Sequence, residues 1–253
     1  MAKIHGKAGE NALSKALKKQ QNTFVVVILC SIVLLEAVGF LWGLSFAKDL
    51  PLKWISALVT ILLGGVLFAM NHKFDAIMEK RAREAQNWRR GFEGERVVSD
   101  ILANELPNTY HVFNDVRFPG RSANIDHLVV GPSGVFVLNT KNWRGTVDWA
   151  QDGKSLLLNG EPEKRNSAKA ALADALDVHD KLKTLLGRDV FVKSVLVFPM
   201  AKVVPRLNMP VDLQQDNYLV EKRLKYIDKR TSLSAKEIEE IAVALQALFR
   251  KSV

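Results

Sequence analysis

The chain has 253 residues, one cysteine and a formal net charge of +9. A single cysteine excludes a disulfide framework and fits a reducing compartment. The charge alone does not indicate nucleic-acid binding, because residues 91–253 carry 23 basic against 21 acidic side chains and most of the excess lies before them. The length allows one or two domains.

Two apolar segments follow a basic N-terminal stretch. Residues 23–46 contain one charged side chain, Glu36, and residues 54–70 contain none. Both approach the ~20 residues that cross a hydrocarbon core of ~30 Å. A pair of core helices is the other interpretation, but a globular helix rarely stays apolar on every face over such a length. The sequence therefore predicts a transmembrane helical hairpin over residues 23–70.

Charged flanks predict how this hairpin is oriented. Residues 1–22 hold five lysines against one glutamate, residues 71–90 hold six basic against three acidic side chains, and residues 47–53 hold two lysines against one aspartate. Basic flanks stay in the cytoplasm, so we expect a multi-pass protein of the inner (cytoplasmic) membrane with both termini and the following domain cytoplasmic. Glu36 is interpreted first as a protonated carboxyl bonded across the hairpin, and second as a contact in a homo-oligomer or an ion path.

Residues 71–90 are rich in helix-forming residues and contain no glycine or proline, which predicts a helical stalk. Gly91 is expected to end it, and residues 92–104 to form a new amphipathic helix. Within that helix, Glu95 either reaches a buried site or is an exposed first-turn glutamate favoured by the helix dipole.

A β-hairpin forms the centre of the sequence. Residues 125–130 and 135–141 are apolar strands, separated by the turn cluster Gly131-Pro-Ser-Gly134. Side chains alternate along a strand, so one face of the second strand begins apolar and ends in an amide and an amine: Val135, Val137, Asn139 and Lys141. A lysine in such a place needs a partner, and Asp126 on the adjacent strand is the candidate.

The remaining pattern predicts a mixed α/β domain. Residue 187, a glycine, is expected to end a long helix, and Ser234 with Glu237 forms a capping box. The predicted strands are 110–118, 145–149, 155–158 and a central 190–198, and the predicted helices are 163–186, 219–230 and 234–251. His111, His127 and His179 lack the spacing of a zinc site.

Three motifs resemble the nuclease-related domain (NERD) family of the PD-(D/E)xK nuclease superfamily. They occur in the family's order, as Gly91-Phe-Glu-Gly-Glu95, residues 124–131 and residues 134–145. The resemblance covers roughly residues 91–198 and implies a restriction-endonuclease-like fold. The chain is thus divided into a basic cytoplasmic N-terminus, a transmembrane hairpin, a helical stalk, a nuclease-related domain and a C-terminal helical extension, over residues 1–22, 23–70, 71–90, 91–200 and 201–253.

The resemblance also implies a catalytic site made of Glu95, Asp126, Asn139 and Lys141. In this family two carboxylates hold a divalent cation, Mg²⁺ or Mn²⁺, so Glu95, Asp126 and Asn139 are the implied metal ligands. Lys141 is then the residue that orients or activates the attacking water. At position 139 the family pattern prefers Glu, Asp or Gln, whereas Asn keeps one oxygen on a short side chain and lacks a negative charge.

Two functions follow from these residues. The first is a membrane-anchored nuclease that hydrolyses phosphodiester bonds of DNA or RNA at the cytoplasmic face, with DNA favoured over RNA. The second is a catalytically inactive module, tethered to the membrane, that binds nucleic acid or docks a protein. Asp126 and Lys141 favour the nuclease, because an inactive site does not need a buried lysine, and Asn139 favours the inactive module.

Overall fold

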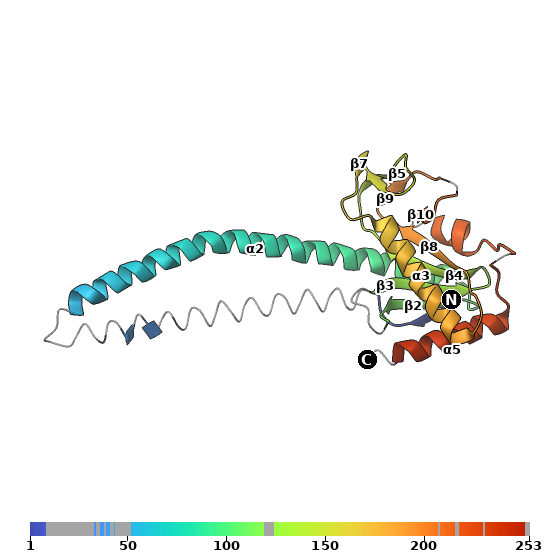
Figure 1. Ribbon diagram of the computed structural model, residues 1–253, viewed down its shortest axis with the longest axis horizontal. Helices are drawn as coiled ribbons and strands as arrows, with labels where there is room; N and C mark the ends of the chain where they lie inside the picture. Colours follow the sequence, from blue (N-terminus) through green and yellow to red (C-terminus); the bar gives the residue numbers. More distant parts are fainter. Residues whose placement is uncertain are drawn as a thin grey trace. The chain divides into compact units, whose positions relative to one another are not determined.

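The computed structural model describes the ordered elements labelled in Figure 1. The described residues are 1–8, 33, 36, 37, 39, 40, 43, 52–118, 124–206, 208–215, 218–229 and 231–250. Contacts divide the chain into two compact units, Met1–Ala12 with Arg90–Val253, and Leu13–Arg89. The first unit contains both β-sheets and the candidate site, and the second contains the first part of the helix α2 (Leu52–Glu105).

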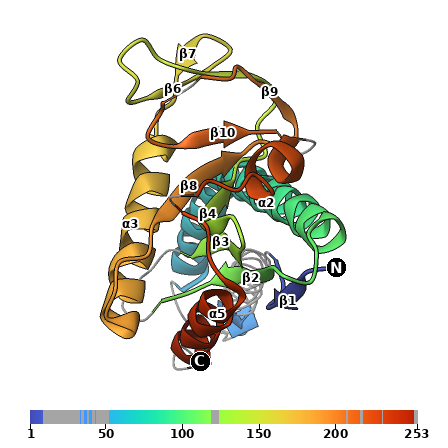
Figure 2. The same cartoon turned by 90° about the vertical axis from the view of Figure 1, so that its right-hand side faces the viewer.

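A six-stranded sheet forms the centre of the first unit (Figure 2). In spatial order the strands are β1 (Lys3–His5), β2 (His111–Val116), β3 (Ile125–Gly131), β4 (Gly134–Thr140), β8 (Val192–Val197) and β10 (Asp212–Gln214). The pairs β2–β3 and β3–β4 are antiparallel, whereas β1–β2, β4–β8 and β8–β10 are parallel.

A smaller, four-stranded sheet is built from the segments that follow β4 and β8. Its core contains Trp149, Leu156 and Phe198, together with Ala168 and Ala171 from the start of helix α3. Its strands are, in spatial order, β7 (Glu161–Pro162), β6 (Leu156–Leu158), β5 (Gly145–Trp149) and β9 (Ala201–Val203).

Helices cover both faces of the large sheet, and Figure 2 shows α3 and the end of α2 on opposite sides of it. Val135 and Val137 of β4 pack in one core with α3 and α5, while Phe136 and Leu138 pack in another with α2 and η1. The two faces of β4 are therefore buried in different cores, as its predicted alternation requires. The described helices are α2 (Leu52–Glu105), α3 (Ser167–Leu186), the π-helix η1 (Leu219–Leu224) and α5 (Ala235–Arg250).

Several local predictions are confirmed. The hairpin forms β3 and β4, and α3 ends at Gly187, whose φ of 67° is the left-handed conformation that glycine adopts without strain. At the start of α5, Glu237 N–H donates to Ser234 Oγ at 3.3 Å and Ser234 N–H donates to Glu237 Oε2 at 2.8 Å. These two bonds are the predicted capping box. The mixed α/β character of the domain is also confirmed.

The predicted transmembrane hairpin over residues 23–70 is wrong. In the ranges that the structure describes, no helix is both long enough and apolar enough to cross a membrane. Residues 54–70 are not a separate span, because they belong to α2, which continues without a break into the charged residues 71–90. Residues 23–46 lie outside the described residues apart from isolated positions. This finding also corrects the predicted multi-pass placement in the inner membrane and removes the basis for a bilayer partner and for an oligomer through the hairpin.

Two helix boundaries also differ from the prediction. α2 runs through Gly91, where a break was expected. A glycine inside a helix costs about 1 kcal/mol relative to alanine, which does not end a helix whose following turns are held by packing. The predicted helix 219–230 is shorter, because η1 ends at Leu224.

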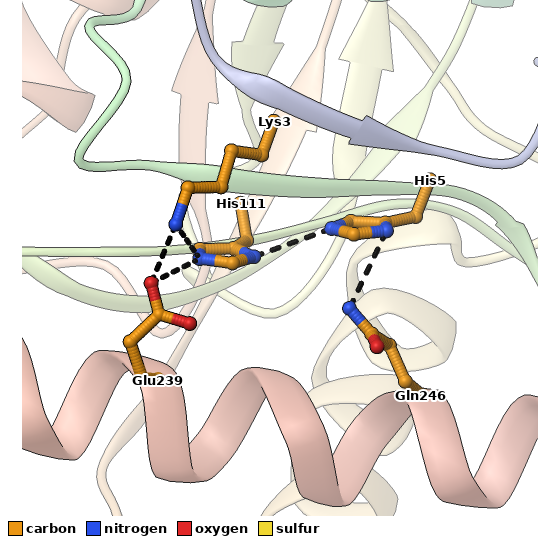
Figure 3. Close-up of polar contacts among 5 residues, drawn as sticks. All are labelled: Lys3, His5, His111, Glu239 and Gln246. Atoms are coloured by element: carbon orange, nitrogen blue, oxygen red, sulfur yellow. Dashed lines mark hydrogen bonds and ion pairs between the residues drawn. The ribbon is translucent and has the colours of Figure 1, made fainter.

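The N-terminal strand β1 is held to the domain by a polar cluster that joins it to β2 and α5 (Figure 3). Lys3 Nζ donates to Glu239 Oε1 at 2.5 Å, and the Glu239 oxygen lies 3.2 Å from His111 Nε2. The other ring nitrogen of His111 lies 3.2 Å from His5 Nε2, and Gln246 Nε2 lies 3.5 Å from His5 Nδ1. The cluster therefore ties residues 3–5 to two elements that are distant in the sequence.

This cluster predicts that the docking of β1 depends on pH. Burial and the neighbouring His111 and Lys3 lower the pKa of His5 below 6.5, and the Glu239 carboxylate only partly opposes them. The folded state thus disfavours protonated His5, so its contribution to docking is complete above pH 6.5 and is lost as the pH falls below that value. We expect amide hydrogen exchange in residues 3–5 to accelerate between pH 7 and 5, after correction for intrinsic rates.

The variant His5→Phe keeps a ring stacked on Phe113, whose centroid lies 4.5 Å from that of His5, and cannot titrate. Its protection should vary less with pH than that of the wild type. An equally steep pH dependence in both proteins would show that His5 is not responsible.

Candidate functional site

The register of the β3–β4 hairpin places Asp126 beside the end of β4. His127 pairs with Leu138, so one step further along the hairpin Asp126 faces Asn139. Asp126 Oδ2 accepts a hydrogen bond from the backbone N–H of Thr140 at 2.6 Å. This bond fixes one carboxylate oxygen of Asp126 on the adjacent strand.

Asn139 occupies the face of β4 that packs against α3. Its side chain is buried, and Nδ2 donates to Asp174 Oδ2 at 3.0 Å. Because a carboxylate accepts and does not donate, this contact also decides which end of the Asn139 amide is the nitrogen. The Oδ1 atom is therefore the acceptor that remains at position 139.

A close approach between α2 and the end of β4 brings Glu95 to the site. A Cβ atom at Gly94 would lie 2.9 Å from Asn142 Cβ and 3.3 Å from Thr140 Cγ2, so this contact needs a glycine. Asn142 Nδ2 also donates to the backbone oxygen of Arg90 at 2.6 Å. Gly94 thus gives the Gly91-Phe-Glu-Gly-Glu95 motif a structural explanation, since it lets the helix turn that carries Glu95 touch the end of the strand.

Several carboxyl groups lie near Glu95. Burial raises the pKa of its carboxyl from 4.5 to about 8, with the charges of Asp126 and Asp115 adding to the shift and that of Lys141 opposing it. The three carboxyls are therefore close enough to repel one another.

The pKa of Asp126 is also raised. Burial raises its pKa from 3.8 to about 6, and the charges of Asp115 and Asp174 contribute to the rise. The Thr140 N–H and the Lys141 ammonium favour the ionised form, but they do not cancel the effect of burial. The structure thus brings Glu95, Asp126 and Lys141 within electrostatic reach of one another.

Asp115 is a site residue that the sequence analysis missed. The β2–β3 ladder pairs Asn114 with His127 and Val116 with Ile125, and it skips Asp115, which has a φ of 55°. Asn124 Nδ2 donates to Asp115 Oδ1 at 2.6 Å. An aspartate tolerates the left-handed conformation better than most residues. The charge of Asp115 helps to raise the pKa values of Glu95 and Asp126, so its carboxyl lies within electrostatic reach of both.

Asp174 is a second residue near the site that the sequence analysis missed, although its position in the predicted helix gave a weak indication of it. It lies on α3 between Ala171 and Val178, two members of the buried stripe of that helix. A charged residue at the flank of a buried helical stripe needs a polar partner. The sequence alone does not show that Asn139 is that partner, because the two residues meet only in the folded domain.

The side chains at the end of β4 have the chemistry that a divalent cation of the Mg²⁺ or Mn²⁺ type would require. Such ions take carboxylate and amide oxygens and retain several waters, so the oxygens of Glu95, Asp126 and Asn139 are of the type they bind. Within the described ranges, no group of three or more His, Cys, Asp or Glu side chains is arranged to hold a metal ion. Glu95 and Asp126 supply two such side chains, and the third oxygen is that of an amide.

Comparison with known proteins shows one family and one relative. Residues 90–199 match the nuclease-related domain family. An uncharacterized protein of Bacillus anthracis is 31% identical over 85 residues, which cover 32% of this chain and 38% of that protein. The match thus spans well under half the length of that relative. No solved structure matches the chain.

The raised pKa of Glu95 makes a prediction about the cation-free protein. The folded state holds this proton up to about pH 8, whereas the unfolded chain releases it near pH 4.5. Between these values the folded state binds more protons, so its free energy of unfolding falls as the pH rises, by up to ~1.4 kcal/mol per pH unit for one group. In EDTA, we expect the melting temperature to fall from pH 7 to 8, where Asp126, with a pKa of about 6, is already largely ionised.

The variant Glu95→Gln should flatten this dependence, whereas Glu93→Gln, at an exposed position in the same helix, should keep it. Thermal melting curves over this pH range measure the difference. A slope in Glu95→Gln as steep as in the wild type would exclude Glu95 as the titrating group.

Proposed function

Because the chain contains a nuclease-related domain over residues 90–199, we propose that it is a nuclease that hydrolyses phosphodiester bonds with the help of Mg²⁺ or Mn²⁺. Nucleic acid is its substrate, with DNA favoured over RNA. The observation that carries the proposal is the gathering of Glu95 and Asp126, both with raised pKa values, beside Lys141 at the end of β4. Acidic groups that repel each other at a strand end are suited to a cation and are unfavourable without one.

The ligands of this cation would be Glu95, Asp126 and Asn139 Oδ1. When bound, the ion supplies Lewis-acid chemistry and lowers the pKa of a coordinated water. The Thr140 N–H holds one oxygen of Asp126 at 2.6 Å and so limits the rotation of that carboxylate. The packing of Gly94 against Asn142 limits the movement of Glu95 in the same way. The chain thus orients the ligands before any substrate binds.

Lys141 would act on the phosphodiester itself. Its backbone N–H donates to the carbonyl oxygen of Val197 at 2.8 Å, which fixes the chain just beyond the end of β4. From there the ammonium group lies close to both carboxylates, orients the attacking water and offsets the negative charge that builds on the phosphate. The water oxygen bonds to phosphorus and releases its proton to solvent, while the bond from phosphorus to the leaving sugar oxygen breaks and that oxygen takes up a proton.

A second candidate function is supported by Asn139. The amide is neutral and its nitrogen is already bonded to Asp174, so position 139 lacks the negative charge that Glu or Asp would supply there. A domain of this kind that binds nucleic acid or a protein without cleaving it would retain the fold and have no turnover. Cleavage assays distinguish the two functions.

We expect the purified full-length protein to cleave plasmid DNA in Mg²⁺ or Mn²⁺ and not in EDTA. Asp126→Ala and Lys141→Ala should each lower the rate by roughly 10²-fold or more, because each removes a group that acts on the reacting atoms. Neither variant should unfold the domain, which circular dichroism would show. Lys154→Ala, at an exposed position between β5 and β6, is the matched control and should cleave like the wild type.

Cleavage that survives both substitutions would come from a contaminant or from another site and would contradict the proposal. A folded wild-type protein that binds DNA or RNA and cleaves neither with any cation would instead support the binding module.

A further inference from the structure

The hydrogen bond between Asn139 and Asp174 joins β4 to α3 directly at the candidate site. Asp174 is on the turn of α3 that packs on the sheet, next to the buried Ala171 and Ala175. These two small residues allow the helix to approach the sheet closely, which brings a short aspartate within 3.0 Å of a strand residue. The contact is therefore fixed by the packing of two regular elements and does not depend on a loop.

This contact has a chemical consequence for Asn139. An amide that is free to turn would present its NH₂ group and its oxygen to the site in either order. With Nδ2 bonded to the Asp174 carboxylate, the nitrogen faces α3 and the oxygen is held as the available acceptor. A hydrogen bond to a carboxylate is about twice as strong as one between neutral groups, so it opposes rotation of the amide.

Asp174 also contributes charge. Its field is one of the causes that raise the pKa of Asp126, so the carboxylate lies within electrostatic reach of the acidic group. The site therefore lacks a carboxylate at position 139, but the Asp174 carboxylate lies next to it, hydrogen-bonded to Asn139 Nδ2.

We propose that Asp174 is a positioning residue of the cation site, which turns the Asn139 oxygen toward the ion and supplies the negative charge that residue 139 lacks. The inference rests on the proposed function, because it assumes that Glu95, Asp126 and Asn139 bind a divalent cation. It adds to that function a residue outside the three matched motifs, on a helix that approaches the site from the α3 face of the sheet. Groups behind a metal ligand commonly change metal affinity by roughly 10–100-fold.

A purely structural role for Asp174 makes a different prediction. If the contact only satisfies a buried amide, Asp174→Asn keeps an oxygen that accepts from Asn139 Nδ2, so it would leave both the melting temperature in EDTA and the cation affinity nearly unchanged. If Asp174 positions the ligand and supplies charge, the same variant lowers cation affinity even where the fold remains stable.

The experiment measures Mn²⁺ binding to the full-length protein by calorimetry, with melting temperature in EDTA as the second readout. We expect Asp174→Asn to weaken binding by roughly 10-fold or more. Asp180→Asn, at an exposed position on the same helix, is the matched control and should bind like the wild type.

The decisive variant exchanges the two residues, as Asn139→Asp combined with Asp174→Asn. It keeps one carboxylate and one amide at the same contact and restores the total charge, so its affinity should return to within a few-fold of the wild type. In a double-mutant cycle the two substitutions would then be strongly non-additive. Asn139→Asp alone places two carboxylates in contact, and we expect it to lower the melting temperature in EDTA and to recover stability when Mn²⁺ is added.

The outcomes separate this inference from the proposed function. A wild-type protein that binds no Mn²⁺ overturns the cation-dependent nuclease and this inference with it. A wild-type protein that binds Mn²⁺, with equal affinity in Asp174→Asn, overturns the role of Asp174 alone. Weak binding in Asp174→Asn that the exchange variant does not restore would also overturn it, because the charge and the contact would then not be what the site needs.

Discussion

The β3–β4 hairpin pairs Gly131 with Gly134 and His127 with Leu138, and the candidate site depends on this register. The turn leaves little freedom, because Gly134 has a φ of 120° and a Cβ at Gly131 would lie 2.1 Å from the ring of Tyr110. A slip by one residue would move every side chain to the opposite face of the sheet. The turn, far from the site, therefore determines that Asp126 meets the end of β4.

The same register brings the carboxyl groups of Glu95 and Asp126 together in a buried place, where their ionised forms are unfavourable. Burial and mutual repulsion raise the pKa values of Glu95 and Asp126, so without a cation the domain stabilises their protonated forms. Asp115 adds to the repulsion from a left-handed backbone position that most residues avoid. Strongly shifted pKa values of buried carboxyl groups are typical of a site that binds an ion or a substrate. The proposed cation would offset the repulsion between these carboxyl groups.

Much of the fold could be predicted because its signals are local. Alternating side chains and a Gly-rich turn gave the hairpin, and Gly187 marked the end of α3. The transmembrane prediction for residues 54–70 was wrong, because hydropathy over a short window does not show that a helix continues past them. Asp115 and Asp174 were missed for a different reason: their roles come from a gap in strand pairing and from a contact between a helix and a strand, and neither leaves a pattern in neighbouring residues.

The proposed cation site consists of Glu95, Asp126 and Asn139 at the end of β4. Crystals of the full-length protein grown with Mn²⁺ and measured near the manganese absorption edge test it directly, because anomalous scattering locates this ion without reference to activity. We expect an anomalous peak within about 2.0–2.6 Å of oxygens of Glu95, Asp126 and Asn139, with waters completing the shell. A map with no peak there, or with manganese bound only elsewhere on the domain, would contradict it.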